Sequence, residues 1–220
     1  MSLYCQTEQL LSNYYVDLTL PEEKKQEEYY AIVRNVVGER YQSIGIKDLF
    51  IHDNLTAGSS EIKCVLNLNA KELIIHGAGV GVVDALCSGL IEYFSSDYIS
   101  LRSVAYNDFS IKTKRGNGMQ QFQPNMPVEI MLTLDNNKGN LYFKKQSKSL
   151  NAAAALVVCA AVEFLINSEL AVKIIYEDIA RAKKRNRGDL VSEYTAYLMD
   201  LVHIVSYESV LNKSHGEDDV

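Results

Sequence analysis

Hydrophobic and polar positions alternate in two similar stretches of the chain, Glu61–Asn69 (EIKCVLNLN) and Glu129–Asp135 (EIMLTLD). Alternation with a period of two predicts a β-strand with one buried face. A short turn follows each stretch, and then a second apolar run, Leu73–His76 or Leu141–Lys144. The turns are residues 69–71 and 136–140. The pattern therefore predicts two β-hairpins.

The period changes to that of a helix after each hairpin. An apolar stripe is expected at Val82, Leu86, Leu90 and Tyr93 or Phe94, opposite a polar stripe at Asp84, Ser88 and Glu92. The second hairpin is followed by SLNAAAALVVCAAVEFLI, which has high helix propensity and one charge. Further strand candidates precede the hairpins at Ile46–His52 and Tyr98–Tyr106. We predict an α+β fold in which a β-β-β-α unit is repeated over residues 45–168. One such unit cannot bury the apolar face of its sheet and of its helix alone, whereas two stacked units can.

The flanking regions are predicted to be helical. Residues 1–44 should hold a short helix at 4–16 and a longer one to Tyr41, which starts in a capping box at Thr19. The inner face of the longer helix is expected to be Tyr30, Val33, Val37 and Tyr41. Residues 169–220 should form helices at Glu169–Arg185 and Asp189–Leu211, separated by Gly188, before a frayed acidic tail.

Composition and charge narrow the class of protein. The chain has 220 residues, is 47% hydrophobic and 23% charged, and carries a formal net charge of −6, so a globular core is expected and nucleic acid is not an expected partner. The cysteines fit no zinc pattern and are expected to be buried free thiols: Cys5, Cys64, Cys87 and Cys159. No signal peptide is expected, and the apolar run Leu150–Ile166 is shorter than the ~20 residues of a membrane span. We expect a soluble cytoplasmic protein without a membrane partner or cofactor.

The most distinctive motif is the glycine-rich turn Gly77–Gly81 (GAGVG), which lies between a predicted strand and a predicted helix. Unpaired N–H groups and the positive end of a helix dipole can hold a carboxylate or a phosphate. The alternative is a tight structural turn in which Asp84 satisfies those N–H groups. A dinucleotide-binding fold is not expected, because Val82 stands where the third glycine belongs and the preceding strands form a hairpin.

The segment Gly77–Leu86 (GAGVGVVDAL) resembles the G-x-G-P-V-D-A motif of the regulatory domain of α-isopropylmalate and citramalate synthases. The match covers Gly79, Gly81, Val83, Asp84 and Ala85, with Val82 in place of the proline. The segment SSDYISLRSV is similar to the next strand of that family. The doubled β-β-β-α pattern is also that of the family's domain, so the resemblance covers residues 45–168.

The resemblance implies a dimerising, feedback-type module of branched-chain amino-acid (leucine) biosynthesis, which binds leucine, isoleucine or a related carboxylate. It implies ligand contacts from both helix starts: Gly79, Val80, Gly81, Asp84, Ser149, Asn151 and Ala152. A homodimer is expected, and a separate synthase subunit is a possible partner.

Catalysis is not expected from this chain. A (β/α)8 barrel needs about 250 residues, and the four histidines are isolated: His52, His76, His203 and His215. The basic run Arg181–Arg187 is interpreted as a solvated helix end, since no aromatic residues interleave with it. Two alternatives stay open: an interaction scaffold that lost the pocket, favoured by the glycine-free second turn KKQSKSLN, and an accessory subunit of a barrel-bearing synthase.

Overall fold

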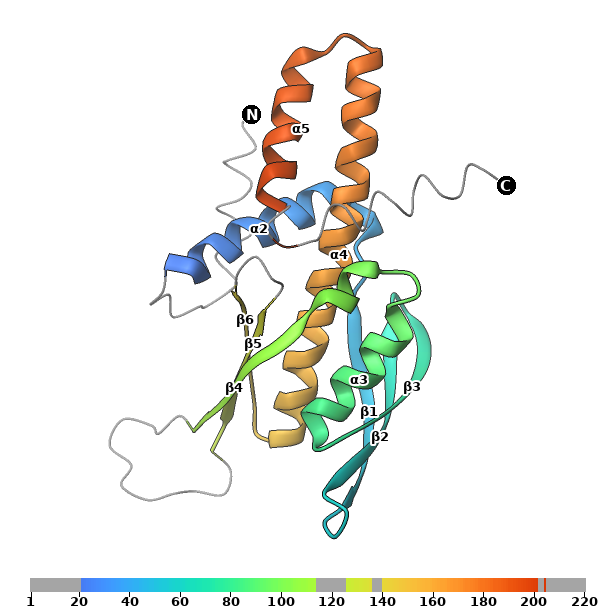
Figure 1. The fold of residues 1–220 in the computed structure, drawn as a ribbon, viewed down its shortest axis with the longest axis vertical. Coiled ribbons are helices and arrows are strands. Elements are labelled where there is room, and N and C mark those ends of the chain that lie inside the picture. Colours follow the sequence, from blue (N-terminus) through green and yellow to red (C-terminus); the bar gives the residue numbers. More distant parts are fainter. Residues whose placement is uncertain (1–20, 114–125, 136–139, 202–203, 205–220) are drawn as a thin grey trace.

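The computed structural model describes residues 21–113, 126–135, 140–201 and 204. It contains two three-stranded antiparallel sheets, each followed in sequence by a helix (Figure 1). The elements before the second sheet are α2 (Pro21–Val37), η1 (Gly38–Arg40), β1 (Ile44–Asn54), β2 (Ser59–Leu68), β3 (Lys71–Gly79), α3 (Val82–Phe94) and η2 (Ile99–Ser103). The others are β4 (Ala105–Thr113), β5 (Val128–Asp135), β6 (Asn140–Ser147), α4 (Leu150–Lys184) and α5 (Gly188–Leu201). The α+β class and the order β-β-β-α, twice, are as predicted.

The two sheets share one pairing register. Ile51, Ile62 and Gly77 form one row of the first sheet. Ile111, Ile130 and Lys145 form the corresponding row of the second. The first strand of each sheet also has a register shift directly before an aspartate, Asp48 in β1 and Asp108 in β4. A bulge bends a strand locally, so the two sheets bend at equivalent points.

The core lies where the inner faces of both sheets meet α3 and α4. The alternation in β2 and β5 buries Ile62, Cys64 and Leu66 in one sheet and Ile130, Leu132 and Leu134 in the other. Helix α3 packs on β2 and β3, α4 packs on β5 and β6, and the two helices contact each other. The predicted apolar stripe of α3 is confirmed by the burial of Leu86, Leu90 and Phe94.

Helix α4 is one continuous helix of 35 residues, so the prediction of a separate helix at Glu169–Arg185 was wrong. Nothing in Leu150–Lys184 interrupts it, because this stretch contains neither glycine nor proline. The limit drawn at residue 168 therefore falls inside α4. By length and composition α4 could cross a membrane, but 67% of its apolar window is buried within the protein, as in the core helix of a soluble protein.

Polar side chains of α4 hold the segments that lead into each sheet. Glu163 accepts hydrogen bonds from the Tyr41 hydroxyl (2.9 Å) and from the Ile44 N–H (2.8 Å) at the start of β1. The side chain of Asn167 forms two hydrogen bonds with the backbone of Gln42, both 2.8 Å long. These contacts place β1 beside α4.

The strand predicted at Tyr98–Tyr106 is wrong in position. Residues Ile99–Ser103 form a 3-10 helix, and the strand, β4, begins only at Ala105 and runs to Thr113. The buried carboxylate of Glu169 accepts the Ser100 N–H at 2.9 Å, and Leu101 is buried. These long-range contacts favour the turn over a strand.

Helix α2 ends at Val37, four residues before the predicted end. Gly38 has a φ of 54°, a left-handed conformation that terminates an α-helix. Val33 and Val37 are buried as predicted, whereas Tyr30 is half-buried against the ring of Phe164. The predicted helix at 4–16, the Thr19 cap, the second hairpin turn at 136–139 and the acidic tail lie outside the described residues.

Candidate functional site

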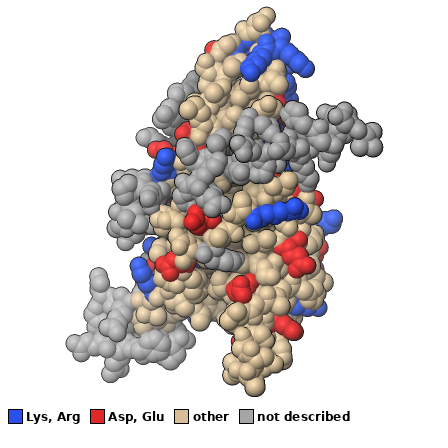
Figure 2. All heavy atoms as spheres, viewed as in Figure 1, with Lys and Arg blue, Asp and Glu red and all other residues tan. Residues whose placement is uncertain are grey.

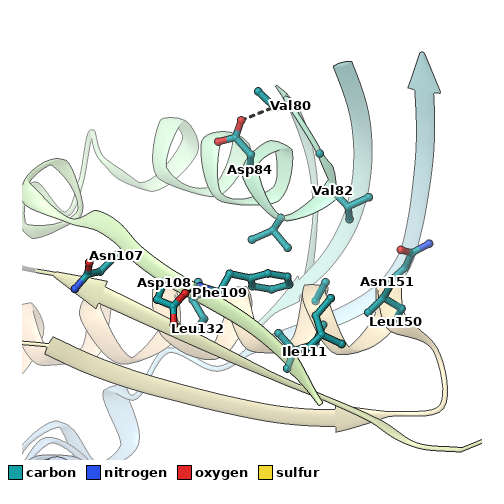
Figure 3. A pocket seen from close by; sticks show the side chains of 14 residues that line it. Val80, Val82, Asp84, Asn107, Asp108, Phe109, Ile111, Leu132, Leu150 and Asn151 are labelled. Carbon is teal, nitrogen blue, oxygen red and sulfur yellow. Dashed lines mark hydrogen bonds between the residues drawn. The ribbon is translucent and has the colours of Figure 1, made fainter. Parts of the chain in front are cut away.

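An apolar cavity of about 700 Å³ lies where the starts of α3 and α4 meet the inner face of β4 and β5 (Figure 3). The two helix starts contribute Val80, Gly81, Val82, Val83, Asp84, Leu150, Asn151 and Ala154. The strands contribute Asn107, Asp108, Phe109, Ile111, Ile130 and Leu132. The two helix starts that the sequence singled out therefore converge on one space.

Four of the seven residues predicted to bind a ligand line this cavity: Val80, Gly81, Asp84 and Asn151. The other three, Gly79, Ser149 and Ala152, lie next to them in sequence but do not line it. Whether any of the seven contacts a ligand stays a prediction.

Asp84 has a structural task in the turn before α3. Its carboxylate accepts the Val80 N–H at 2.9 Å, and Figure 3 shows the side chain turned back toward Val80. A Cβ on Gly79 would lie 2.5 Å from that carboxylate, which explains the glycine at this position by packing alone. The geometry of the turn therefore explains why Asp84 and Gly79 stand at these positions, without a ligand.

Gly81 differs from its neighbours, because packing does not require a glycine there. It is the N-cap residue of α3, with an extended backbone, and a Cβ built on it meets no atom within 4 Å. The first helical hydrogen bond of α3 joins the Ala85 N–H to the Gly81 carbonyl. The N–H groups of Val82 and Val83 precede that bond, so they lie among the unpaired donors that every helix start presents.

The start of α4 is capped by its own side chain. Ser149 is the N-cap residue, and its hydroxyl accepts the Ala152 N–H at 3.3 Å. Ser149 and Ala152 are therefore engaged with each other, and neither lines the cavity. Asn151, in the first turn of α4, is exposed and lines the cavity.

The strand side of the cavity was not predicted from the sequence. Phe109 and Ile111 project from β4 toward the start of α3 (Figure 3), and they are 38% and 50% exposed. The alternation Phe109-Ser110-Ile111 could have revealed them, had β4 not been placed too early in the sequence. In β1 the equivalent positions are Leu49 and Ile51, which are only half-buried but pack against the core.

The remaining polar side chains of the cavity wall have partners nearby. The Asn107 amide donates to the Asn140 side chain at 3.0 Å, and the Asp108 carboxylate accepts the Phe109 N–H at 2.8 Å. With Asp84 also engaged, the cavity presents mainly carbon atoms. An anion would meet backbone N–H groups there, and no lysine or arginine lines the cavity.

Basic residues gather away from the cavity (Figure 2). Figure 2 shows basic side chains at the end of the molecule formed by the α4–α5 turn, the run Arg181–Arg187. Arg187 forms an ion pair with Asp189 at 2.6 Å, and this hydrogen-bonded contact lowers the pKa of Asp189 to about 2. All five basic residues of the run are exposed, as expected for a solvated helix end.

The described cysteines are buried, whereas the two described histidines of the sheets are exposed. Cys64, Cys87 and Cys159 are buried free thiols, as predicted, and Cys5 lies outside the described residues. Burial raises the pKa of the Cys64 thiol to about 11 and also raises that of Cys159. His52 and His76 are exposed, and among the described residues no three His, Cys, Asp or Glu side chains are grouped to hold a metal.

Comparison with known proteins does not assign the chain to a family. No protein-family model matches the sequence, and no curated protein matches it.

Proposed function

We propose that this protein is a non-catalytic regulatory module that binds a small amino acid or a related carboxylate with an apolar side chain. The observation that carries the proposal is the convergence of the starts of α3 and α4 on one apolar cavity of about 700 Å³. Small-molecule sites commonly enclose ~300–1,000 Å³, with apolar walls and a few polar groups.

The cavity supplies two of the three features that recognition of an amino acid requires. Phe109, Ile111 and Leu150 form an apolar wall for the side chain. The N–H groups of Val82 and Val83, at the positive end of the α3 dipole, suit a carboxylate. An ammonium group would be received by a backbone carbonyl or the Asn151 side chain, since Asp84 is engaged with Val80.

Calorimetric titration with leucine, isoleucine, valine and the corresponding 2-keto acids tests this function. We expect heat of binding and a raised melting temperature with at least one of them. Absence of both signals for all these compounds would argue strongly against the proposal.

A substitution at Gly81 ties the binding to the cavity. Gly81→Leu should place a side chain at the cavity wall, and its Cβ would meet no atom within 4 Å. We expect at least tenfold weaker binding with an unchanged melting temperature. Gly188→Leu is the matched control, since Gly188 also has open space around its Cβ position but lies at the start of α5.

We also propose that the module is a homodimer related to the regulatory domain of the α-isopropylmalate and citramalate synthases, acting on a separate synthase subunit. The two β-β-β-α units with a common register and a common bulge position support this relation. Sedimentation velocity tests the dimer, and a monomer at all concentrations would contradict it.

One observation favours the second candidate, a scaffold without a ligand. The Asp84 carboxylate accepts a hydrogen bond within the turn before α3, and the Ser149 hydroxyl caps the start of α4. A scaffold would keep its protein partner in the Gly81→Leu variant, whereas a sensor would lose its response to the ligand. Co-purification of the wild type and the variant with the same partner therefore separates the two candidates.

A further inference from the structure

The cavity is larger than a free aliphatic amino acid needs. The cavity, of about 700 Å³, is open to solvent and has mainly apolar walls. Small-molecule sites of ~300–1,000 Å³ hold drug-sized ligands. Size therefore admits a longer ligand.

The walls also favour a ligand that is mostly hydrocarbon. Phe109, Ile111 and Leu150 are 38%, 50% and 45% exposed, although all three line the cavity. The equivalents of the first two in β1 pack against the core. The strand side of the cavity thus lacks the apolar partner that its counterpart in the first sheet has.

One end of the cavity presents an exposed polar side chain that could contact the polar group of a ligand. Asn107, Asp108 and Asp84 are held by bonds to Asn140, Phe109 and Val80. Asn151, by contrast, is exposed at the start of α4. In Figure 3 Asn151 and Leu150 lie at the same end of the cavity, beyond Ile111.

We propose that the ligand is a medium-chain aliphatic carboxylate, whose chain of about eight to ten carbons lies along Phe109 and Ile111. Its carboxylate lies near Asn151 and the N–H groups at the start of α3. This inference rests on the proposed function, since it names the ligand class of the same site. The ligand remains a carboxylate, but its aliphatic chain is longer than an amino-acid side chain.

Titration with a homologous series provides the test. Leucine, hexanoate, octanoate and decanoate are titrated calorimetrically into the full chain, at constant pH and salt and below micelle-forming concentrations. We expect the Kd to fall about threefold per added methylene up to eight to ten carbons, and then to level off once the cavity is filled.

The outcomes separate this inference from the proposed function. If leucine binds and octanoate does not, or binds no more tightly than hexanoate, the chain-length inference is wrong while the proposed function stands. If no compound of the series or of the amino-acid set binds, both are wrong.

Two variants and a control locate the binding. Phe109→Ala should weaken octanoate binding about tenfold and leucine binding less. Ile111→Ala serves the same purpose and keeps the test decisive if the first variant fails to fold. Phe50→Ala is the control, because Phe50 is 59% exposed on β1, on the strand face opposite the half-buried Leu49 and Ile51. An equal loss of octanoate affinity in Phe50→Ala would show non-specific adsorption and overturn the proposal.

Discussion

The glycines around the turn before α3 serve different purposes at the scale of single residues. A Cβ on Gly77 would lie 2.0 Å from the Ala85 carbonyl oxygen, and one on Gly89 would lie 2.5 Å from the His76 carbonyl oxygen. These two glycines let β3 and α3 approach each other closely. Gly81 has no such neighbour, so packing does not explain its small size.

Gly89→Ala is therefore expected to destabilise the fold by about 2–3 kcal/mol, since the backbone of β3 or α3 must move to relieve the overlap. Gly81→Ala should change the free energy of unfolding by less than about 0.5 kcal/mol. Denaturation with urea measures both values. Equal effects of the two substitutions would contradict this assignment of roles.

The turn between β2 and β3 contains a residue in an unfavourable conformation. Asn69 and Ala70 have φ angles of 50° and 68°, and the left-handed region costs an alanine roughly 1–2 kcal/mol. Ala70→Gly should raise the free energy of unfolding by about 1 kcal/mol. Ala78→Gly, in the extended strand β3, is the control and should lower it. A loss of stability in Ala70→Gly would show that the turn is not strained.

At the scale of elements, α4 organises the fold through three polar residues that bind neighbouring segments of the chain. Glu163 and Asn167 bind the segment that enters β1, and Glu169 binds the turn that precedes β4. Glu169 also forms an ion pair with Lys173 at 2.8 Å. One helix thereby positions the first strand of both sheets.

Removal of the Glu163 carboxylate should separate β1 from α4. Glu163→Ala leaves the Ile44 N–H and the Tyr41 hydroxyl without their acceptor, and we expect a loss of about 2–3 kcal/mol in the free energy of unfolding. Glu163→Gln keeps one acceptor oxygen and should lose about half as much. Hydrogen exchange at Ile44 should quicken in both variants, and unchanged exchange there would contradict the anchoring role.

At the scale of the whole molecule, the thiols report on the integrity of the core. Cys64 and Cys159 belong to the cluster that joins both sheets to α3 and α4. Desolvation raises the pKa of Cys64 from 9.0 to about 11, so the thiol stays protonated in the folded protein at neutral pH. The unfolded chain ionises it at lower pH, so folding is favoured below pH 9 and that contribution is lost as the pH rises toward 11.

In a Cys5→Ser variant, the buried thiols Cys64, Cys87 and Cys159 should react with a thiol reagent only as fast as the protein unfolds. The free energy of unfolding should fall between pH 9 and pH 11. Absorbance of the released reagent and urea denaturation at several pH values measure these effects. Rapid reaction in native conditions would show that the core opens locally.

The sequence predicted the elements better than their limits. The hairpins and the helix Val82–Phe94 followed from local alternation and periodicity, because each has one buried face that its own residues specify. The strand placed at Tyr98–Tyr106 was wrong, because Ser100 and Leu101 owe their conformation to Glu169 and to the core. Part of the candidate site was predicted. The glycine motif indicated the two helix starts, but the β4 residues of the cavity wall were not predicted, because the strand was placed too early in the sequence.

The amino-acid sequence by itself determined the period of each segment, and therefore the order β-β-β-α occurring twice, because local periodicity decides which face of a strand or helix can be buried. Only the tertiary structure decided how the two units meet. It brought two helix starts to one cavity, assigned Asp84 to the turn, and left Phe109 and Ile111 facing open space. The physical reason is that such contacts join residues far apart in the chain, and their energies depend on packing that local sequence does not encode.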